Sequence, residues 1–270
     1  MTDALLTIDS LTKRFGGVTA CDGIDLVVPA GELHAIIGPN GAGKTTLIGQ
    51  LTGEIVPDAG RIHFAGEDIT ALPVHRRSRR GLARSFQITS LFNDFTALDN
   101  VALAVQAHAG HSFHFWRDAR SDTALRTPAR ETLTCVGLAG RENVIVSSMS
   151  HGEHRQLEIA MALATRPRML LLDEPMAGMG PDESARMVAT LRELKRELTI
   201  LLIEHDMEAV FALADRITVL VYGRIIASGS PEEIRANADV RQAYLGEQEA
   251  QGAQGPAAGG EAAQSGAPHG

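Results

Sequence analysis

The chain has 270 residues, a formal net charge of −8 and 44% hydrophobic residues. This length suits one large domain or two small ones, with enough apolar side chains for a sizeable core. The acidic balance argues against a dedicated nucleic-acid binder, which usually carries a strongly basic domain. The densest positive cluster, at residues 75–80, is short and is interpreted as a solvated helix face.

Cysteine usage and the N-terminal sequence limit the cellular setting. Cys21 and Cys135 share no short spacing, which favours a reducing compartment and no cysteine metal site. The first residues lack the basic start and apolar run of a signal peptide. No apolar run approaches the ~18–20 residues that cross a bilayer. We therefore expect the chain to work at a membrane only when a partner docks it there.

Apolar runs of strand length alternate along the chain with segments of helical spacing. The expected strands are residues 5–11, 23–28, 33–37, 60–64, 169–172, 199–203, 217–221 and 224–227. The expected helices are residues 44–51, 150–164 and 183–197, and residues 94–146 have helical spacing. This alternation predicts an α/β domain with a largely parallel sheet and a helical insert. Gly, Ala, Pro and Gln dominate residues 251–270, which predicts a disordered tail.

A glycine-rich loop separates the third expected strand from the helix that follows it. Its sequence is Gly38-Pro39-Asn40-Gly41-Ala42-Gly43-Lys44-Thr45-Thr46. This is the phosphate-binding loop pattern, in which glycines let backbone N–H groups approach phosphates and the helix dipole attracts the same anion. Lys44 is placed to reach the β- and γ-phosphates, and the Thr45 hydroxyl to ligate Mg²⁺. The alternative is a glycine-rich turn with a chance lysine, which the strand and helix context disfavours.

Two acidic residues, Asp173 and Glu174, follow directly after a buried strand. Ligands of open α/β sheets bind outside the carboxyl ends of the strands. Asp173 is therefore expected to hold Mg²⁺, directly or through water. Glu174 is expected to act as the general base toward the attacking water. The alternative is a helix N-cap before Pro175.

Two neutral polar residues are candidates for sensing the γ-phosphate. His205 follows another buried strand and is expected at the same rim of the sheet, where a catalytic role is assigned to it. Gln87 lies where the sheet region gives way to the helical insert. Its amide can reach Mg²⁺ or water and lose that contact after hydrolysis. A capping or solvated histidine and a surface glutamine are the alternatives.

The segment Met149-Ser150-His151-Gly152-Glu153-His154-Arg155-Gln156-Leu157 begins a helix. Ser150 and Glu153 have the spacing of a capping box. The segment also resembles the signature motif of ABC (ATP-binding cassette) ATPases, and it lies between the phosphate loop and the acidic strand, as in that family. With the phosphate loop, Gln87, Asp173-Glu174 and His205, the resemblance spans residues from about 5 to 245.

The resemblance implies a fold and its boundaries. The fold is a P-loop NTPase (RecA-like) α/β core with an ABC antiparallel β subdomain and an inserted α-helical subdomain. The ATPase domain covers residues 1–250, with the core at 1–87 and 158–250 and the helical subdomain at about 88–157. The implied cofactors are ATP and Mg²⁺. Phe15 falls where the family places a ring against adenine, although residue patterns alone predict a core or surface aromatic.

The resemblance also implies a shared catalytic site. Two subunits sandwich two ATP molecules head to tail, so each γ-phosphate meets Lys44 and Thr45 of one subunit. Ser150, Gly152 and Glu153 of the other subunit complete the site, which is the logic of an arginine finger. Three positions depart from the family: His151 stands where most members have Gly, Glu153 where many have Gln, and Gly180 where Asp is usual.

Within ABC ATPases, the chain is similar to the Liv-type G subunits that serve branched-chain amino-acid importers. The similarity lies in residues 82–87, 157–160, 177–179 and 241–246 and in a long insert at about residues 108–126. It implies a second ABC ATPase subunit, identical or not, two transmembrane permeases and, indirectly, a periplasmic solute-binding protein. The chain would then lie peripherally on the cytoplasmic face of the inner or plasma membrane, without nucleic acid.

Other functions stay open at this point. Close relatives import urea or amides or energise lipopolysaccharide export, and the solute itself never touches this kind of subunit. A soluble ABC ATPase acting on DNA or ribosomes usually carries two cassettes or a long coiled coil, and this chain shows neither. A regulatory module that holds ATP without hydrolysing it is disfavoured by Glu174 and His205.

Overall fold

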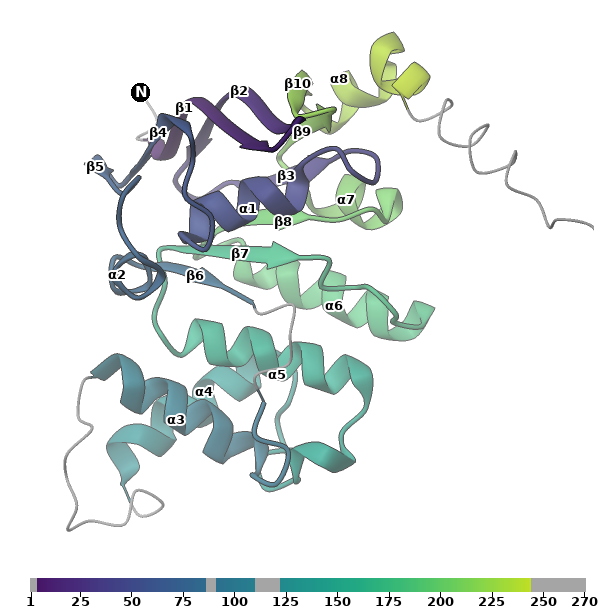
Figure 1. The fold of residues 1–270 in the computed structure, drawn as a ribbon. Helices are drawn as coiled ribbons and strands as arrows, with labels where there is room; N and C mark the ends of the chain where they lie inside the picture. The colour runs from purple at the N-terminus through teal and green to yellow at the C-terminus, as the bar shows by residue number, and fades with distance from the viewer. Residues whose placement is uncertain (1–3, 86–90, 110–121, 244–270) are drawn as a thin grey trace, which may run out of the picture.

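The strands in the described part of the chain form two sheets (Figure 1). The computed structural model describes residues 4–85, 91–109 and 122–243. A four-stranded antiparallel sheet has the order β2-β1-β4-β5. Its strands are β1 (Ala4–Phe15), β2 (Val18–Pro29), β4 (Ala59–Phe64) and β5 (Glu67–Asp68). The expected antiparallel β subdomain is thus present, and β1 and β2 are longer than the sequence pattern predicted.

The second sheet is six-stranded and mostly parallel, with the order β10-β9-β3-β8-β7-β6. Its strands are β3 (Leu33–Ile37), β6 (Leu82–Arg84), β7 (Met169–Asp173), β8 (Thr199–Ile203), β9 (Arg216–Val221) and β10 (Arg224–Gly229). Only the edge strand β10 is antiparallel. The carboxyl ends of β3, β7 and β8 therefore meet at one rim, as the sequence predicted.

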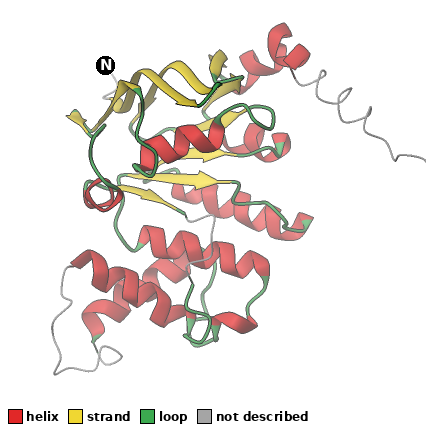
Figure 2. Ribbon diagram, in the orientation of Figure 1, coloured by secondary structure: helices red, strands yellow, loops and turns green. Residues whose placement is uncertain are grey.

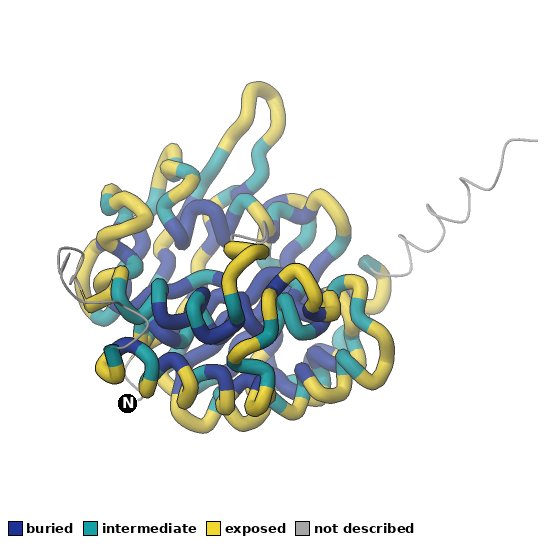
Figure 3. Tube along the Cα trace, turned by 90° about the horizontal axis from the view of Figure 1, so that it is seen from below, coloured by how far each residue is buried: buried dark blue, intermediate teal, exposed yellow. Residues whose placement is uncertain are grey.

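Two hydrophobic cores share the six-stranded sheet. Leu170 and Leu172 of β7 point into one core, whereas Met169 and Leu171 point into the other. Burial on both faces explains why these strands read as unbroken apolar runs. Figure 3 shows the buried chain in the middle of the molecule and the exposed chain at its turns. The antiparallel sheet covers one face and most of the helices cover the other (Figure 2).

The helices divide between the two faces. They are α1 (Lys44–Thr52), α2 (Val74–Arg79), α3 (Ala97–Ala109), α4 (Thr123–Cys135), α5 (His151–Leu163), α6 (Pro181–Leu194), α7 (Met207–Leu213) and α8 (Pro231–Ala236). Helices α3, α4 and α5 pack against one another, which confirms the expected helical insert. Helix α1 packs into the core that the antiparallel sheet covers. Among the described residues, no helix combines the length and apolar character needed to cross a bilayer.

The basic cluster at residues 75–80 is not wholly a solvated helix face, so that prediction was wrong for Arg77. The side chain of Arg77 is buried, and its guanidinium donates to the carbonyls of Gln50 (2.6 Å), Leu51 (2.7 Å), Leu72 (2.8 Å) and Thr70 (2.8 Å). Burial lowers the pKa of Arg77 to about 10. The residue satisfies carbonyls at the C-terminal end of α1, which otherwise lack intrahelical partners.

The predicted boundaries, with the core at residues 1–87 and 158–250 and the helical subdomain at about 88–157, stay a prediction. The tail at residues 251–270 lies outside the described residues, as do residues 110–121 of the long insert. Within the described residues, Cys21 and Cys135 are both free thiols.

Candidate functional site

The loop after β3 adopts a backbone that only glycine tolerates at two positions. Gly38 has φ +155° and Gly43 has φ +104°. A Cβ at Gly38 would collide with the carbonyl oxygen of Leu220, and one at Gly43 with that of Ala20. Backbone atoms cannot yield as a flexible side chain can, so both glycines are required for the loop to close.

The loop leads into the N-terminus of α1, which no side chain caps. Gly43 is the N-cap residue in a left-handed conformation, and the first turn carries no acidic residue. Thr45 is exposed there. The buried Lys44 ammonium donates to the carbonyls of Gly38 (2.5 Å) and Pro39 (3.0 Å). A helix N-terminus with a lysine beside it and no side-chain cap is suited to bind an external anion.

Asp173 ends β7, and its buried carboxylate forms an ion pair with the side chain of Arg84. The Arg84 guanidinium donates to Asp173 Oδ2 at 3.0 Å and to Glu54 Oε2 at 2.7 Å. Burial raises the pKa of Asp173, against the opposing charges of Arg84 and Lys44. The charge of Lys44 in the phosphate loop thus acts on the carboxylate at the end of β7. The buried carboxylate of Asp173 and the exposed hydroxyl of Thr45 are hard oxygen donors, the ligand type that magnesium prefers.

Glu174 and His205 lie together at the same rim. Glu174 has a left-handed backbone, with φ +50°, a conformation that is strained for a residue with a side chain and is frequent at functional sites. His205 Nδ1 lies 3.8 Å from Glu174 Oε1. Glu204 is buried and accepts from the N–H groups of Met176 (3.0 Å) and His205 (2.8 Å). Glu204 thus ties the turns after β7 and β8 together, a role that sequence reasoning missed.

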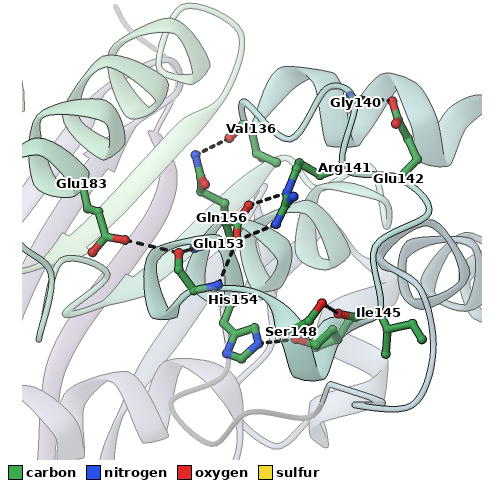
Figure 4. Close-up of polar contacts among 12 residues, drawn as sticks. Val136, Gly140, Arg141, Glu142, Ile145, Ser148, Glu153, His154, Gln156 and Glu183 are labelled. Carbon is green, nitrogen blue, oxygen red and sulfur yellow. Dashed lines mark hydrogen bonds and ion pairs between the residues drawn. The ribbon is translucent and has the colours of Figure 1, made fainter.

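Ser150 and Glu153 form the predicted capping box at the start of α5. Ser150 N–H donates to Glu153 Oε2 at 2.8 Å, and Glu153 N–H donates to Ser150 Oγ at 3.3 Å. Arg141 donates to Glu153 through Nε (2.6 Å) and Nη2 (3.2 Å). Figure 4 shows Arg141 meeting Glu153 from one side of the helix. The acidic residue of the box is therefore fixed by an arginine of the preceding segment.

A second carboxylate reaches the same helix start from α6. Ser150 Oγ donates to Glu183 Oε1 at 3.3 Å. A Cβ at Gly152 would lie 2.7 Å from Glu183 Oε1, so Glu183 packs directly on that glycine. His151, a departure from the family pattern, donates through Nε2 to the Ala177 carbonyl at 3.1 Å. The signature segment thus contacts the chain that follows the acidic strand, and sequence reasoning missed Glu183.

The candidate residues lie in two places, at the rim of the six-stranded sheet and at the start of α5. The rim of the six-stranded sheet brings together Lys44, Asp173, Glu174 and His205. Ser150 begins α5, which packs on the opposite face of the sheet from α1. Phe15 ends β1 and is half exposed, with the Lys13 ammonium 5.4 Å from its ring centroid. Gln87 lies outside the described residues.

The comparison with protein families agrees with this geometry. The description "ABC transporter" matches residues 21–177, more than half of the chain. The chain belongs to the ABC transporter family. A second description, "Branched-chain amino acid ATP-binding cassette transporter", matches residues 224–250 of this ABC cassette, which include β10 and α8.

Curated relatives match this ABC cassette over nearly their whole length. The chain is 41% identical over 254 residues to the high-affinity branched-chain amino acid transport ATP-binding protein BraF of Pseudomonas aeruginosa, covering 92% of this chain and 100% of BraF. It is 38% identical over 256 residues to the corresponding protein LivG of Escherichia coli, with the same coverage. The suspected family and its Liv-type branch are thereby confirmed.

Solved structures confirm the expected P-loop ABC fold. The ADP conformation of an ATP-binding cassette of an ABC transporter matches with a TM-score of 0.80 and 29% identity, covering 91% of this chain and 100% of that one. A nucleotide-free cassette matches with a TM-score of 0.79 and 28% identity, covering 90% and 99%. Nucleotide binding follows from membership of this family of ABC ATPases.

The third departure from the ABC family pattern, Gly180, lies at the start of α6. Gly180 occupies the N-cap position of α6 without a side-chain cap. Its N–H donates to Glu183 Oε2 at 3.4 Å, a long hydrogen bond. Glu183 thus supports both the start of α6 and the start of α5.

Proposed function

We propose that this chain is the ATP-hydrolysing subunit of an ABC importer for branched-chain amino acids. The observation that carries the proposal is the rim itself, where the phosphate loop, a buried carboxylate and the Glu174–His205 pair meet. The similarity to BraF and LivG over 92% of the chain supports the choice of solute. Urea or amide import and lipopolysaccharide export are the alternatives within the family.

Each residue of the rim has an assigned role. The loop N–H groups and Lys44 bind the phosphates of ATP, for which Lys44 leaves its present carbonyl partners. Thr45 and Asp173 would hold magnesium, and bound magnesium neutralises charge on the phosphates. Glu174 accepts the proton of the attacking water, and His205, 3.8 Å away, contacts the γ-phosphate. Gln87 and Phe15 keep their predicted roles toward magnesium and adenine.

A second ATPase subunit completes the site in this proposal. Ser150, Gly152 and Glu153 lie at the start of a helix on the other face of the sheet from α1. They therefore serve a nucleotide bound by a second subunit, identical or not. Such trans stabilisation of the transferred phosphate is worth ~10³–10⁵-fold in rate where it has been measured for arginine fingers.

The described surface also offers a place for the permease subunits. A cavity of about 570 Å³ lies between core elements and the helical insert, lined among others by Val74, Leu82, Arg84, Ala104 and Met161. A permease segment seated there touches α2 and β6 as well as α3 and α5. It would sense any movement between them. We place the chain on the cytoplasmic face of the membrane, with two permeases and, beyond them, a periplasmic solute-binding protein.

The decisive experiment replaces Glu174 by Gln. Purified wild-type protein, alone or with its cognate subunits, is expected to bind and hydrolyse ATP with Mg²⁺. Glu174→Gln is expected to bind ATP and lose at least ~100-fold in turnover, since general bases contribute ~10²–10⁴-fold. Glu208→Gln, an exposed glutamate near the same rim, is the matched control. Unchanged turnover in Glu174→Gln contradicts the assigned base.

Uptake assays with the same variants, each expressed in cells that lack the chain, identify the transported solute. Wild type and Glu208→Gln are expected to restore uptake of labelled leucine, isoleucine and valine, whereas Glu174→Gln does not. Restored urea or amide uptake without leucine uptake would assign the chain to that alternative. A defect confined to lipopolysaccharide export would assign the other.

A further inference from the structure

A buried arginine connects the rim of the sheet to the cavity between core and helical insert. Arg84 ends β6, and its side chain is 11% exposed. One nitrogen, Nη2, meets Asp173 Oδ2 at 3.0 Å, where the Asp173 side chain is 3% exposed. The other, Nη1, meets Glu54 Oε2 at 2.7 Å, where Glu54 is 44% exposed. Arg84 and Glu54 also line the cavity of about 570 Å³. One guanidinium therefore serves a buried and an accessible carboxylate together.

The two carboxylates compete for a charge that cannot be removed. A buried carboxylate needs a counter-charge, and breaking such a pair is unfavourable. Arg84 supplies that charge to Asp173, and arginine stays protonated at any ordinary pH. A magnesium ion at Asp173 therefore meets a cation already in place. Since Glu54 offers Arg84 an alternative partner at 2.7 Å, the guanidinium has somewhere to go when the metal arrives.

The packing around Arg84 also indicates that its present position is not fully satisfied. Its Nε is buried without a hydrogen-bond partner among the described residues. An unpaired buried donor raises the free energy of the arrangement. A shift of the guanidinium toward Glu54 and the cavity surface would expose this donor to water. The burial of Arg84, its two ion pairs and its unpaired Nε all favour a guanidinium that can move from Asp173 toward Glu54.

We infer that Arg84 is a positioning residue that holds Asp173 in the metal-free protein and passes to Glu54 when magnesium binds. This inference rests on the proposed function, in which Asp173 holds the ion. It makes Glu54, which lines the cavity and is 44% exposed, a control on magnesium uptake. Whatever occupies that cavity and contacts Glu54 alters the ease with which the ATP site acquires its metal.

The test is a magnesium titration of nucleotide binding, with a fluorescent ADP analogue and the full-length chain. Arg84→Gln removes the competing charge, so half-saturation is expected at a magnesium concentration on the order of five-fold lower. Glu54→Gln leaves Arg84 to Asp173 alone, and the midpoint is expected to rise roughly two- to three-fold. Arg84→Lys keeps a charge and is expected within about two-fold of wild type. Arg80→Gln, at the exposed Arg80–Glu67 pair, is the control.

A double variant separates the relay from simple charge effects. If Glu54 acts through Arg84, Glu54→Gln has no effect in an Arg84→Gln background; an equal shift in both backgrounds overturns the relay. A raised midpoint in Arg84→Gln, or none of these shifts, also overturns it. Glu54→Gln alters only the exposed partner and gives an answer even if Arg84→Gln fails to fold. Wild-type protein that binds no nucleotide would instead refute the proposed function.

Discussion

Helices α1 and α5 both begin beside a glycine that we assign to a phosphate, yet their N-termini are completed in opposite ways. The first turn of α1 has no side-chain cap and no acidic residue. The first turn of α5 has a complete capping box, and Arg141 holds its Glu153. The N-terminus of α1 is thus left to an external anion, whereas that of α5 already carries its own.

The same two helices are also anchored at opposite ends. Arg77 donates to the carbonyls of Gln50 and Leu51 at the C-terminal end of α1. The Arg141–Glu153 pair lies instead at the N-terminal end of α5. The comparison teaches that a helix end reserved for a ligand can stay uncapped when the other end is fixed. It also predicts where each helix is sensitive to substitution.

The largest expected effect comes from removing the anchor of α1. Arg77→Met leaves two buried and two partly buried carbonyls without their donor, and we expect the free energy of unfolding to fall by ~3–5 kcal/mol. Chemical denaturation followed by circular dichroism measures this loss. Arg76→Met, on the exposed side of the same helix, is the control and is expected within about 0.5 kcal/mol of wild type. Equal stability of the two variants would contradict the anchoring role.

The next effect separates the two glycines. Gly43→Ala forces a Cβ against the backbone carbonyl of Ala20 at φ +104°, and nucleotide affinity is expected to fall by on the order of 100-fold. Gly152→Ala meets only the flexible end of Glu183, so binding to a single subunit is expected within about two-fold of wild type. Titration with a fluorescent nucleotide compares them. Similar losses at both positions would remove the distinction between the helix starts.

The smallest effect concerns the anchor of α5. The Arg141 and Glu153 side chains are 41% and 22% exposed, so Arg141→Met is expected to cost at most about 1 kcal/mol at pH 7. Burial raises the pKa of Glu153, but hydrogen bonds from Ser150 and Arg141 more than offset this, and the folded pKa lies below its ordinary value.

The pH dependence of that small effect checks its origin. Because the folded pKa of Glu153 is lowered, its stabilisation is present above the unfolded value of about 4.3. It is lost as pH falls through the folded pKa. The stability difference between wild type and Arg141→Met should therefore shrink in acid. A difference that is constant from pH 7 into strong acid would assign it to packing rather than to the ion pair.

The sequence predicted the elements that have a strong pattern. The apolar runs of β3, β8 and β9 and the capping box of α5 were recognisable because burial and capping leave a local signature. The short elements β5, β6, α7 and α8 were missed, since two to seven residues show no clear period. The glycine-rich loop and the acids after β7 were recognisable as contiguous motifs beside buried strands, and their roles toward ATP and magnesium stay predictions.

The contacts that sequence could not supply join residues far apart in the chain. Arg84 meets Glu54 and Asp173, which are 30 and 89 positions away. Glu183 meets Ser150 across 33 positions. No single segment marks either contact, because each partner alone reads as an ordinary charged residue. Arg77 was interpreted as solvated for the same reason, since its four partners are backbone carbonyls without any side-chain pattern.

The six-stranded sheet has a consequence for how the protein melts. Successive residues of β7 belong to different cores. This strand therefore packs against both the core that contains α1 and the core that contains α3, α4 and α5, and neither core stays intact without it. Unfolding of the core that contains α1 exposes the β7 side chains that pack in the other core, and unfolding of that other core has the same effect in reverse. The two cores should therefore unfold as one cooperative unit. Probes placed in the two cores are expected to report the same melting temperature.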